Sequence, residues 1–400
     1  MGRVGMDAST APRRYAYVSS ASSLCSVYVR SAGLRTPADR NAGEGGRGGP
    51  SMAFGRTLRC DFWIIIAFVL CASKPTDALD NGVGLLPTMG WGTWNLFGCF
   101  GYNWTEVDVR QMADAMVSSG MRDAGYKYIN LDGGWQSGRG VNGVPIPDPA
   151  KFPSGIRALA DYVHNLNLSF GIYRDRTADF GYEEADAKQY AAWGADYVKN
   201  DGYGPCKPPC RPHNLTSSDI YARFRDAVNA TGRPMVLNIK FDVEPGGFEQ
   251  AASLANSWRV GRDVRPVWAD VVRLADIAAP LGHLAHPGGF NDLDALEVGV
   301  PATIFEGGAG CLGFCPSTRV LRGECVDSGR NATMTLGEQK TMFSIWAITT
   351  SMLIAGNDLR TMSEETRQVL ISPGPISVNQ DPLAVGGEKL HLIDSTSRLP

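Results

Sequence analysis

Residues 156–201, IRALADYVHNLNLSFGIYRDRTADFGYEEADAKQYAAWGADYVKND, hold the pattern that decides the fold. The stretch opens with apolar residues at the 3.6-residue period of an amphipathic helix, namely Ile156, Leu159, Val163 and Leu166. Two short apolar runs follow at residues 170–175 and 197–201, and each ends in an aspartate. Runs of this length that alternate with helical patterns indicate parallel strands joined by helices.

The same alternation continues through the chain from residue 86 onward. Strand candidates lie at residues 88–94, 126–132, 170–175, 197–201, 235–240, 257–263, 283–292 and 353–358. Eight strands separated by helical patterns predict an α/β fold, a (β/α)₈ TIM barrel, over residues 79–385. The alternative is an open doubly wound sheet, but no G-x-G-x-x-G motif follows a strand.

Composition excludes several classes of protein. The 400 residues carry a net charge of −3, with 44% hydrophobic and 20% charged residues, which is typical of a globular protein. This balance provides no basic field for nucleic acid. The sequence contains no G-x-x-x-x-G-K-[ST] motif and only five His residues. We therefore expect no nucleotide cofactor and no metal, although the two C-x₃-C pairs leave a zinc site as a weak alternative.

The first 78 residues differ from the rest of the chain. Residues 1–51 hold seven Arg against three acidic residues and are interpreted as a disordered extension or a false upstream start, with a transit peptide as a weaker alternative. Residues 52–78 join Arg56 and Arg59 to an apolar run at 62–72, the pattern of a secretory signal peptide. Because a bilayer span needs about 20 residues, we expect no stable membrane span. The alternative is a buried core helix.

Cysteines and glycosylation sequons agree with secretion. Six cysteines follow the predicted signal peptide, namely Cys99, Cys206, Cys210, Cys311, Cys315 and Cys325. An even number indicates disulfides, and the connectivity stays open. N-x-[ST] sequons occur at Asn103, Asn167, Asn214, Asn229 and Asn331. We expect the protein to enter the secretory pathway and to become extracellular or lysosomal/vacuolar.

Carboxylates end most of the strand candidates. They are Asp132, Asp175, Asp201, Asp263, Asp292 and Asp358. In a TIM barrel the active site lies at the carboxyl ends of the strands, so these groups are expected to converge on one mouth. The alternative is that each aspartate caps the helix that follows it, which we expect for two or three of them.

Two of these carboxylates suit catalysis of glycoside hydrolysis. Lys199 and Asp201 share one face of a strand, and the cation keeps the carboxylate ionised as a nucleophile requires. Asp263 follows Trp258, an apolar neighbour expected to raise the pKa of a general acid. A pair of carboxylates about 5–5.5 Å apart is typical of a retaining glycosidase. Trp residues near the mouth are expected either to stack on a sugar or to pack in the core; they are Trp91, Trp94 and Trp135.

From residue 79 to residue 387 the sequence resembles the α-galactosidase (melibiase) family of retaining glycoside hydrolases. The segments that carry the resemblance are NGVGLLPTMGWGTWN, YKYINLDGGW, FPSGIRALADYVH, WGADYVKNDG, NSWRVGRD, HPGGFNDLDALEVG, IAGNDLR and ISVNQD. By the family pattern K-x-D, the nucleophile is Asp201, and by W-R-x-x-x-D the acid/base is Asp263. The resemblance also implies sugar-contacting positions at Trp94, Asp132, Tyr173, Lys199, Arg259 and Asp294.

Departures from the family pattern bear on specificity. The usual L-D-D-C-W is Leu-Asp-Gly133-Gly134-Trp, and the glutamate of the usual C-E-W is replaced by Lys240. The resemblance implies hydrolysis of terminal α-D-galactosides in an oligosaccharide, glycolipid or glycoprotein. Alternatives are the same mechanism on an α-N-acetylgalactosaminide or a β-L-arabinopyranoside, or a non-catalytic glycan-binding barrel. The family also carries a C-terminal antiparallel β domain, of which residues 386–400 would form only the start. A homodimer is compatible with the sequence.

Overall fold

The computed structural model describes residues 79–98, 103–202, 215–240, 247–301, 333–387 and 389. The predicted extension at 1–51, the predicted signal peptide at 52–78 and all nine cysteines lie outside these residues. Most of the predicted C-terminal β segment also lies outside them. The predictions for these segments therefore remain predictions.

Eight parallel strands form one sheet in the order β10-β1-β2-β5-β6-β7-β8-β9. Their bounds are β1 Met89–Gly92, β2 Tyr128–Asn130, β5 Ser169–Asp175, β6 Tyr197–Asp201, β7 Val236–Lys240, β8 Ser257–Arg259, β9 Phe290–Asp292 and β10 Leu353–Ala355. Leu296, just after β9, closes the ring onto β10: its N–H donates to the Ile354 carbonyl at 2.7 Å, and the Gly356 N–H donates to its carbonyl at 3.2 Å. The predicted TIM barrel is confirmed.

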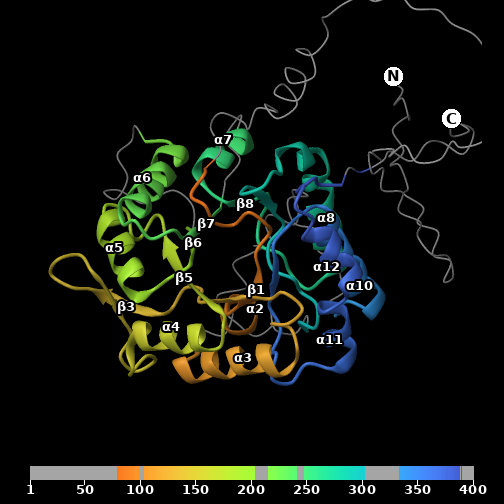
Figure 1. Cartoon of the computed structure of the whole chain (residues 1–400), viewed down its shortest axis with the longest axis horizontal. Coiled ribbons are helices and arrows are strands. Elements are labelled where there is room, and N and C mark those ends of the chain that lie inside the picture. Colours follow the sequence, from red (N-terminus) through yellow and green to blue (C-terminus); the bar gives the residue numbers. More distant parts are fainter. Residues whose placement is uncertain are drawn as a thin grey trace, which may run out of the picture. The chain divides into compact units, whose positions relative to one another are not determined.

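Helices surround the strands (Figure 1). They are α2 Trp94–Phe97, α3 Glu106–Ser118, α4 Gly155–Asn165, α5 Glu183–Trp193, α6 Ser217–Ala230, α7 Gly247–Leu254, α8 Trp268–Ala278, the 3₁₀ helix η2 Ala279–Leu284, α10 Leu336–Ile348, α11 Glu364–Leu370 and α12 Pro373–Asn379. The apolar stripe that predicted α4 is buried at Ile156, Leu159 and Val163. Capping boxes start α3 at Thr105, α6 at Thr216 and α10 at Thr335.

Strand register sets the functional side chains level with one another. Asp175 on β5 pairs with Asp201 on β6, and Tyr173 pairs with Lys199 two residues earlier. Farther round the barrel, Lys240 on β7 pairs with Arg259 on β8. Because neighbouring parallel strands end together, their last side chains meet at the carboxyl end of the barrel.

A two-stranded hairpin follows β2 and was not predicted. Its strands are β3 Gln136–Arg139 and β4 Pro145–Pro147. The turn contains Asn142-Gly143, a dipeptide that favours tight hairpin turns, and Gly143 has φ +72°. The hairpin thus had a sequence signal, and it places Gln136 at the barrel mouth.

Candidate active site

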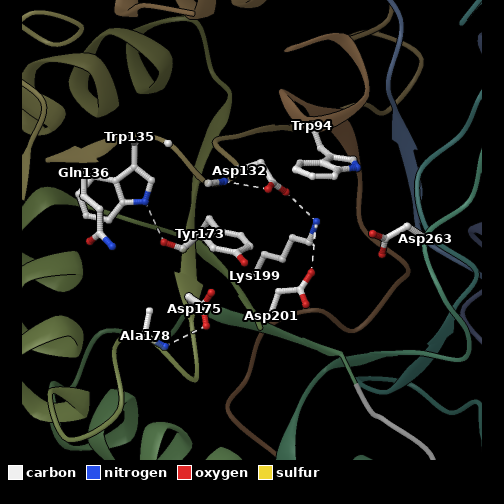
Figure 2. Close-up of a pocket in the computed structure, with 12 residues that line it drawn as sticks. Trp94, Asp132, Trp135, Gln136, Tyr173, Asp175, Ala178, Lys199, Asp201 and Asp263 are labelled. Atoms are coloured by element: carbon white, nitrogen blue, oxygen red, sulfur yellow. Dashed lines mark hydrogen bonds and ion pairs between the residues drawn. The ribbon is translucent and has the colours of Figure 1, made fainter. Parts of the chain in front are cut away.

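One pocket opens at the carboxyl ends of the strands (Figure 2). Its lining consists of Trp94, Asp132, Gly133, Gly134, Trp135, Gln136, Tyr173, Asp175, Ala178, Lys199, Asp201 and Asp263. Six of the eight predicted site residues are therefore brought together here. Only Arg259 and Asp294 are missing from the lining.

Lys199 links two of the carboxylates (Figure 2). Its Nζ lies 2.6 Å from Oδ2 of Asp132 and 3.8 Å from Oδ2 of Asp201. Burial alone would lower the pKa of Lys199, but Asp132 and Asp201 outweigh burial and raise that pKa above its usual value. Lys199 therefore stays charged beside Asp201, as its position on the same strand face predicted.

Asp201 ends β6 and is buried, with its carboxylate toward the pocket. The N–H of Gly202 donates to its Oδ1 at 2.6 Å, and the Nζ of Lys240 lies 3.8 Å from the same oxygen. Because Lys240 Nζ is also 3.2 Å from Oδ1 of Asp263, the two carboxylate oxygens lie within about 7 Å of each other. This limit accommodates the separation of about 5–5.5 Å that retaining glycosidases use.

Asp263 follows β8, and one of its carboxylate oxygens contacts two cationic side chains. Oδ1 accepts a hydrogen bond from Nη2 of Arg259 at 2.9 Å and one from Nζ of Lys240 at 3.2 Å. Burial raises the pKa of Asp263, but Arg259 and Lys240, with Lys199, lower it well below its ordinary value. The expectation of a raised pKa is therefore wrong. The side chain that motivated it, Trp258, instead donates to Asn291 in the core.

Arg259 and Asp294 lie behind the pocket wall. The side chain of Arg259 is 2% exposed, and its Nη2 lies 2.8 Å from Oδ2 of Asp294. The same oxygen accepts the N–H of Val264, and Asp294 itself has a left-handed φ of +77°. Burial raises the pKa of Asp294 to about 6 despite the contact with Arg259. In this structure both residues hold Asp263 and its loop and do not form part of the pocket surface.

Aromatic side chains occupy different positions at the mouth. Trp94 and Tyr173 line the pocket, and Trp135 lines it while donating its Nε1–H to the Tyr173 carbonyl at 2.9 Å. Trp91 is fully buried and donates to the Asn357 carbonyl, so it packs in the core. Trp94 and Tyr173 are thus the aromatic residues best placed to meet a sugar ring.

Two lining residues, Gln136 and Ala178, were not predicted as parts of the site. Gln136 comes from the hairpin, and its Nε2 lies 3.4 Å from Asp179. Ala178 lies in the turn after β5, where Oδ1 of Asp175 accepts the N–H groups of Thr177 and Ala178. Asp175 therefore closes its own turn and still lines the pocket; it does not cap the following helix α5, whose N-cap is Tyr182. By contrast, Asp358 pairs with Arg360, outside the pocket lining.

Within the described ranges, no group of three or more His, Cys, Asp and Glu side chains is arranged to hold a metal ion. Among the helices that the structure describes, none is long and apolar enough to cross a membrane. The polar groups that line the pocket include carboxylates, the ammonium of Lys199 and amide groups. Such groups suit a neutral hydroxylated ligand.

The mouth of this (β/α)₈ barrel brings a K-x-D carboxylate, a second carboxylate and two aromatic side chains into one pocket. This combination of fold and site is that of a glycoside hydrolase. Comparison with known proteins specifies which one: residues 86–303 match the family model described as "Alpha galactosidase A". The chain belongs to the α-galactosidase family.

Named relatives agree with this assignment. A probable α-galactosidase of Dictyostelium discoideum is 37% identical over 79% of this chain and 74% of its own length. The α-galactosidase of Cyamopsis tetragonoloba is 36% identical over 78% and 68%. Among solved structures, α-galactosidase from Saccharomyces cerevisiae has a TM-score of 0.61 at 30% identity, covering 76% of this chain and 66% of that one. This chain thus spans about two thirds to three quarters of these relatives.

Proposed function

We propose that the protein hydrolyses terminal α-D-galactosides with retention of anomeric configuration, through a covalent intermediate on Asp201. The observation that carries the proposal is the placement of Asp201 between two cations at the base of a pocket that Asp263 also lines. Family membership supports galactoside as the substrate class, since the relatives are named α-galactosidases.

In the first step a carboxylate oxygen of Asp201 attacks the anomeric carbon, and the bond to the aglycone breaks as Asp263, acting as the acid, donates a proton to the aglycone oxygen. In the second step Asp263 takes a proton from water, which attacks the same carbon and releases Asp201. Lys199 keeps Asp201 ionised before attack and holds Asp132 toward the sugar. Trp94 and Tyr173 would cover the apolar face of the ring.

A second candidate is the same mechanism on a related sugar. Gly133 leaves the wall beside Asp132 without a second carboxylate, and Lys240 adds a cation close to both acids. A site built to hydrogen-bond a sugar hydroxyl strongly rejects a sugar that lacks that hydroxyl. These two changes therefore bear directly on which sugar is bound. A non-catalytic role fits less well, because both predicted catalytic carboxylates line the pocket.

We further propose that the protein is secreted or delivered to a lysosome or vacuole, and acts on oligosaccharide, glycolipid or glycoprotein chains. Of the five sequons, Asn103, Asn167 and Asn229 are described and all three are exposed, as glycosylation requires. N-terminal sequencing of the exported protein is expected to give a start near Leu79, and a cytosolic, unglycosylated product with an intact N-terminus would contradict this proposal.

The activity is tested by incubating the purified protein with aryl glycosides of α-galactose, α-N-acetylgalactosamine and β-L-arabinopyranose. We expect hydrolysis of the α-galactoside, with α-galactose as the first sugar anomer seen by NMR. Preference for another sugar of the panel would favour the second candidate. Inactivity of the well-folded protein on every sugar would favour the glycan-binding alternative.

A further inference from the structure

Lys240 lies between the two catalytic carboxylates. It is the last residue of β7, its side chain is 14% exposed, and its Nζ lies 3.2 Å from Asp263 and 3.8 Å from Asp201. Of the two contacts, the shorter one is to the predicted acid/base. Lys240 is therefore placed to act on the reaction through Asp263.

Asp263 is surrounded mainly by positive charge. Arg259 from β8 and Lys240 from β7 share its Oδ1, and Lys199 from β6 adds a third cation. The opposing charges are Asp201 on β6, and Asp292 and Asp294 at and after the end of β9. Asp294 offsets part of the charge of Arg259. Since burial raises the pKa of Asp294 to about 6, this offset weakens under acidic conditions.

A general acid must carry a proton when the aglycone leaves, and an ionised Asp263 carries none. Arg259 and Lys240, with Lys199, together lower the pKa of Asp263 and so favour its carboxylate form. A carboxylate is still the form that the second step needs, because there Asp263 accepts a proton from water. The arrangement thus favours the second step and makes Asp263 a poor proton donor in the first.

We propose that Lys240 makes this enzyme much faster on glycosides whose aglycone leaves as a stabilised anion, such as a phenolate, than on glycosides with a sugar or alcohol aglycone. This inference rests on the proposed galactosidase function. Asp201 forms a bond to the anomeric carbon while the bond from that carbon to the aglycone oxygen breaks, and its electron pair leaves on the phenolate. Water then replaces Asp201, Asp263 takes one proton of that water, and the proton passes through solvent to the phenolate. The net reaction is glycoside and water to sugar and phenol.

Phenols suit this preference because they ionise near the pKa of tyrosine, about 10, whereas alcohols and sugars are much weaker acids. A leaving group that needs little protonation loses little when no acid is available. Lys240 is thus a positioning residue, acting by the protonation state of Asp263 and without a required contact to the substrate.

The test compares kcat/KM for dinitrophenyl, nitrophenyl, phenyl and methyl α-galactosides across pH. The proteins are the wild type, Lys240→Met and the control Lys188→Met, which removes an exposed lysine that pairs with the exposed Glu184. For the wild type we expect a loss of at least about 10³-fold from the dinitrophenyl to the methyl substrate. Lys240→Met should gain at least about tenfold on the methyl substrate, because one unit in the acid's pKa is tenfold in its protonated fraction. The gain should shrink as the leaving group improves, and Lys188→Met should match the wild type.

The pH profile of the wild type gives a result that does not depend on any variant. On the methyl substrate kcat/KM should fall with rising pH across the neutral range, while the dinitrophenyl substrate shows no such fall. Comparable wild-type activity on methyl and dinitrophenyl galactosides would overturn the inference and leave the proposed function standing. Inactivity on every aglycone would overturn the proposed function and the inference together. A folded Lys240→Met protein with wild-type leaving-group dependence would overturn the role of Lys240.

Discussion

Two groups of buried charges in this barrel are held in opposite ways. The hairpin cluster consists of Arg139, Arg174, Asp179 and Asp186. The pocket cluster consists of Asp132, Lys199, Asp201, Lys240, Arg259, Asp263 and Asp294. Both clusters place carboxylates and cations out of bulk water, yet of the two only the pocket cluster contributes side chains to the lining of the active-site pocket.

The two clusters differ in the lengths of their ion pairs. In the hairpin cluster Arg139 lies 2.6 Å from both Asp179 and Asp186, and Arg174 lies 3.0 Å from Asp186. In the pocket cluster the outer pairs are equally short, but Lys199 and Lys240 both lie 3.8 Å from Asp201. Tight pairing on every side makes the hairpin cluster a structural support. Looser contacts at Asp201 leave its carboxylate able to exchange a cation for a substrate.

The largest effect is expected from Asp201→Asn. Because an amide cannot form the covalent glycosyl intermediate, kcat should fall by at least about 10⁴-fold, an effect comparable to the loss of a nucleophile in other enzymes. Stability should be kept, since the variant removes a buried charge whose cation contacts are long. Turnover of an aryl galactoside and thermal unfolding measure the two properties. Residual activity near that of the wild type would remove the pocket cluster from the chemistry.

Arg139→Met should give the reverse result, a loss of stability. It leaves Asp179 and Asp186 buried beside the single cation Arg174, and breaking such a buried pairing costs about 3–5 kcal/mol of unfolding free energy. Denaturant unfolding measures the loss. Arg157→Met, which breaks an exposed pair with Asp161, is the matched control and should change stability by about 0.5 kcal/mol or less. Equal stability of the two variants would contradict the structural role of the hairpin cluster.

The pH dependence of stability should report Asp294. Its folded pKa of about 6 lies above the unfolded value of about 3.9, so the folded protein binds more protons than the unfolded chain between these values. Its contribution to stability is therefore present at low pH and is lost as pH rises from about 4 to 6, amounting to at most about 3 kcal/mol. Asp294→Asn should lack this decline when unfolding is measured at both pH values. An unchanged decline in the variant would show that Asp294 is ionised throughout the window.

Gly133→Asp should have the smallest effect of the set. A carboxylate restored beside Asp132 offers a hydrogen bond to a sugar hydroxyl, and a bond of this kind contributes about 1–3 kcal/mol, so kcat/KM on an aryl α-galactoside should rise by about tenfold. Gly134→Asp is the control: Gly134 has φ +89°, so the side chain strains the backbone and should lower stability. No gain from Gly133→Asp would indicate that another group makes the contact or that the sugar differs.

Much of the fold was predictable, because strand length, periodicity and strand ends are local properties. Residues 197–201 were predicted and found as β6. The segment predicted at 283–292 is a strand only from Phe290, because η2, with a proline in its first turn, occupies its beginning. The hairpin was missed although Asn142-Gly143 signalled it.

The site was predictable to the level of which residues meet, and less so in its electrostatics. Strand ends and the family pattern placed Asp201 and Asp263 in one pocket. The lowered pKa of Asp263 arises from side chains on three different strands, namely β6, β7 and β8. The sequence neighbour Trp258 was a poor guide, because successive residues of a strand face opposite sides: Trp258 packs in the core, while Arg259 contacts Asp263.

The roles of the two carboxylates are tested most directly by Asp263→Ala with azide and an activated aryl α-galactoside. The variant keeps Asp201, so the covalent intermediate forms, and azide replaces the water that Asp263 would activate. We expect azide to raise turnover and to yield α-galactosyl azide, in which the configuration is retained. A β-galactosyl azide would contradict the account, because it would mean that azide attacks the substrate directly and that Asp263, not Asp201, is the nucleophile.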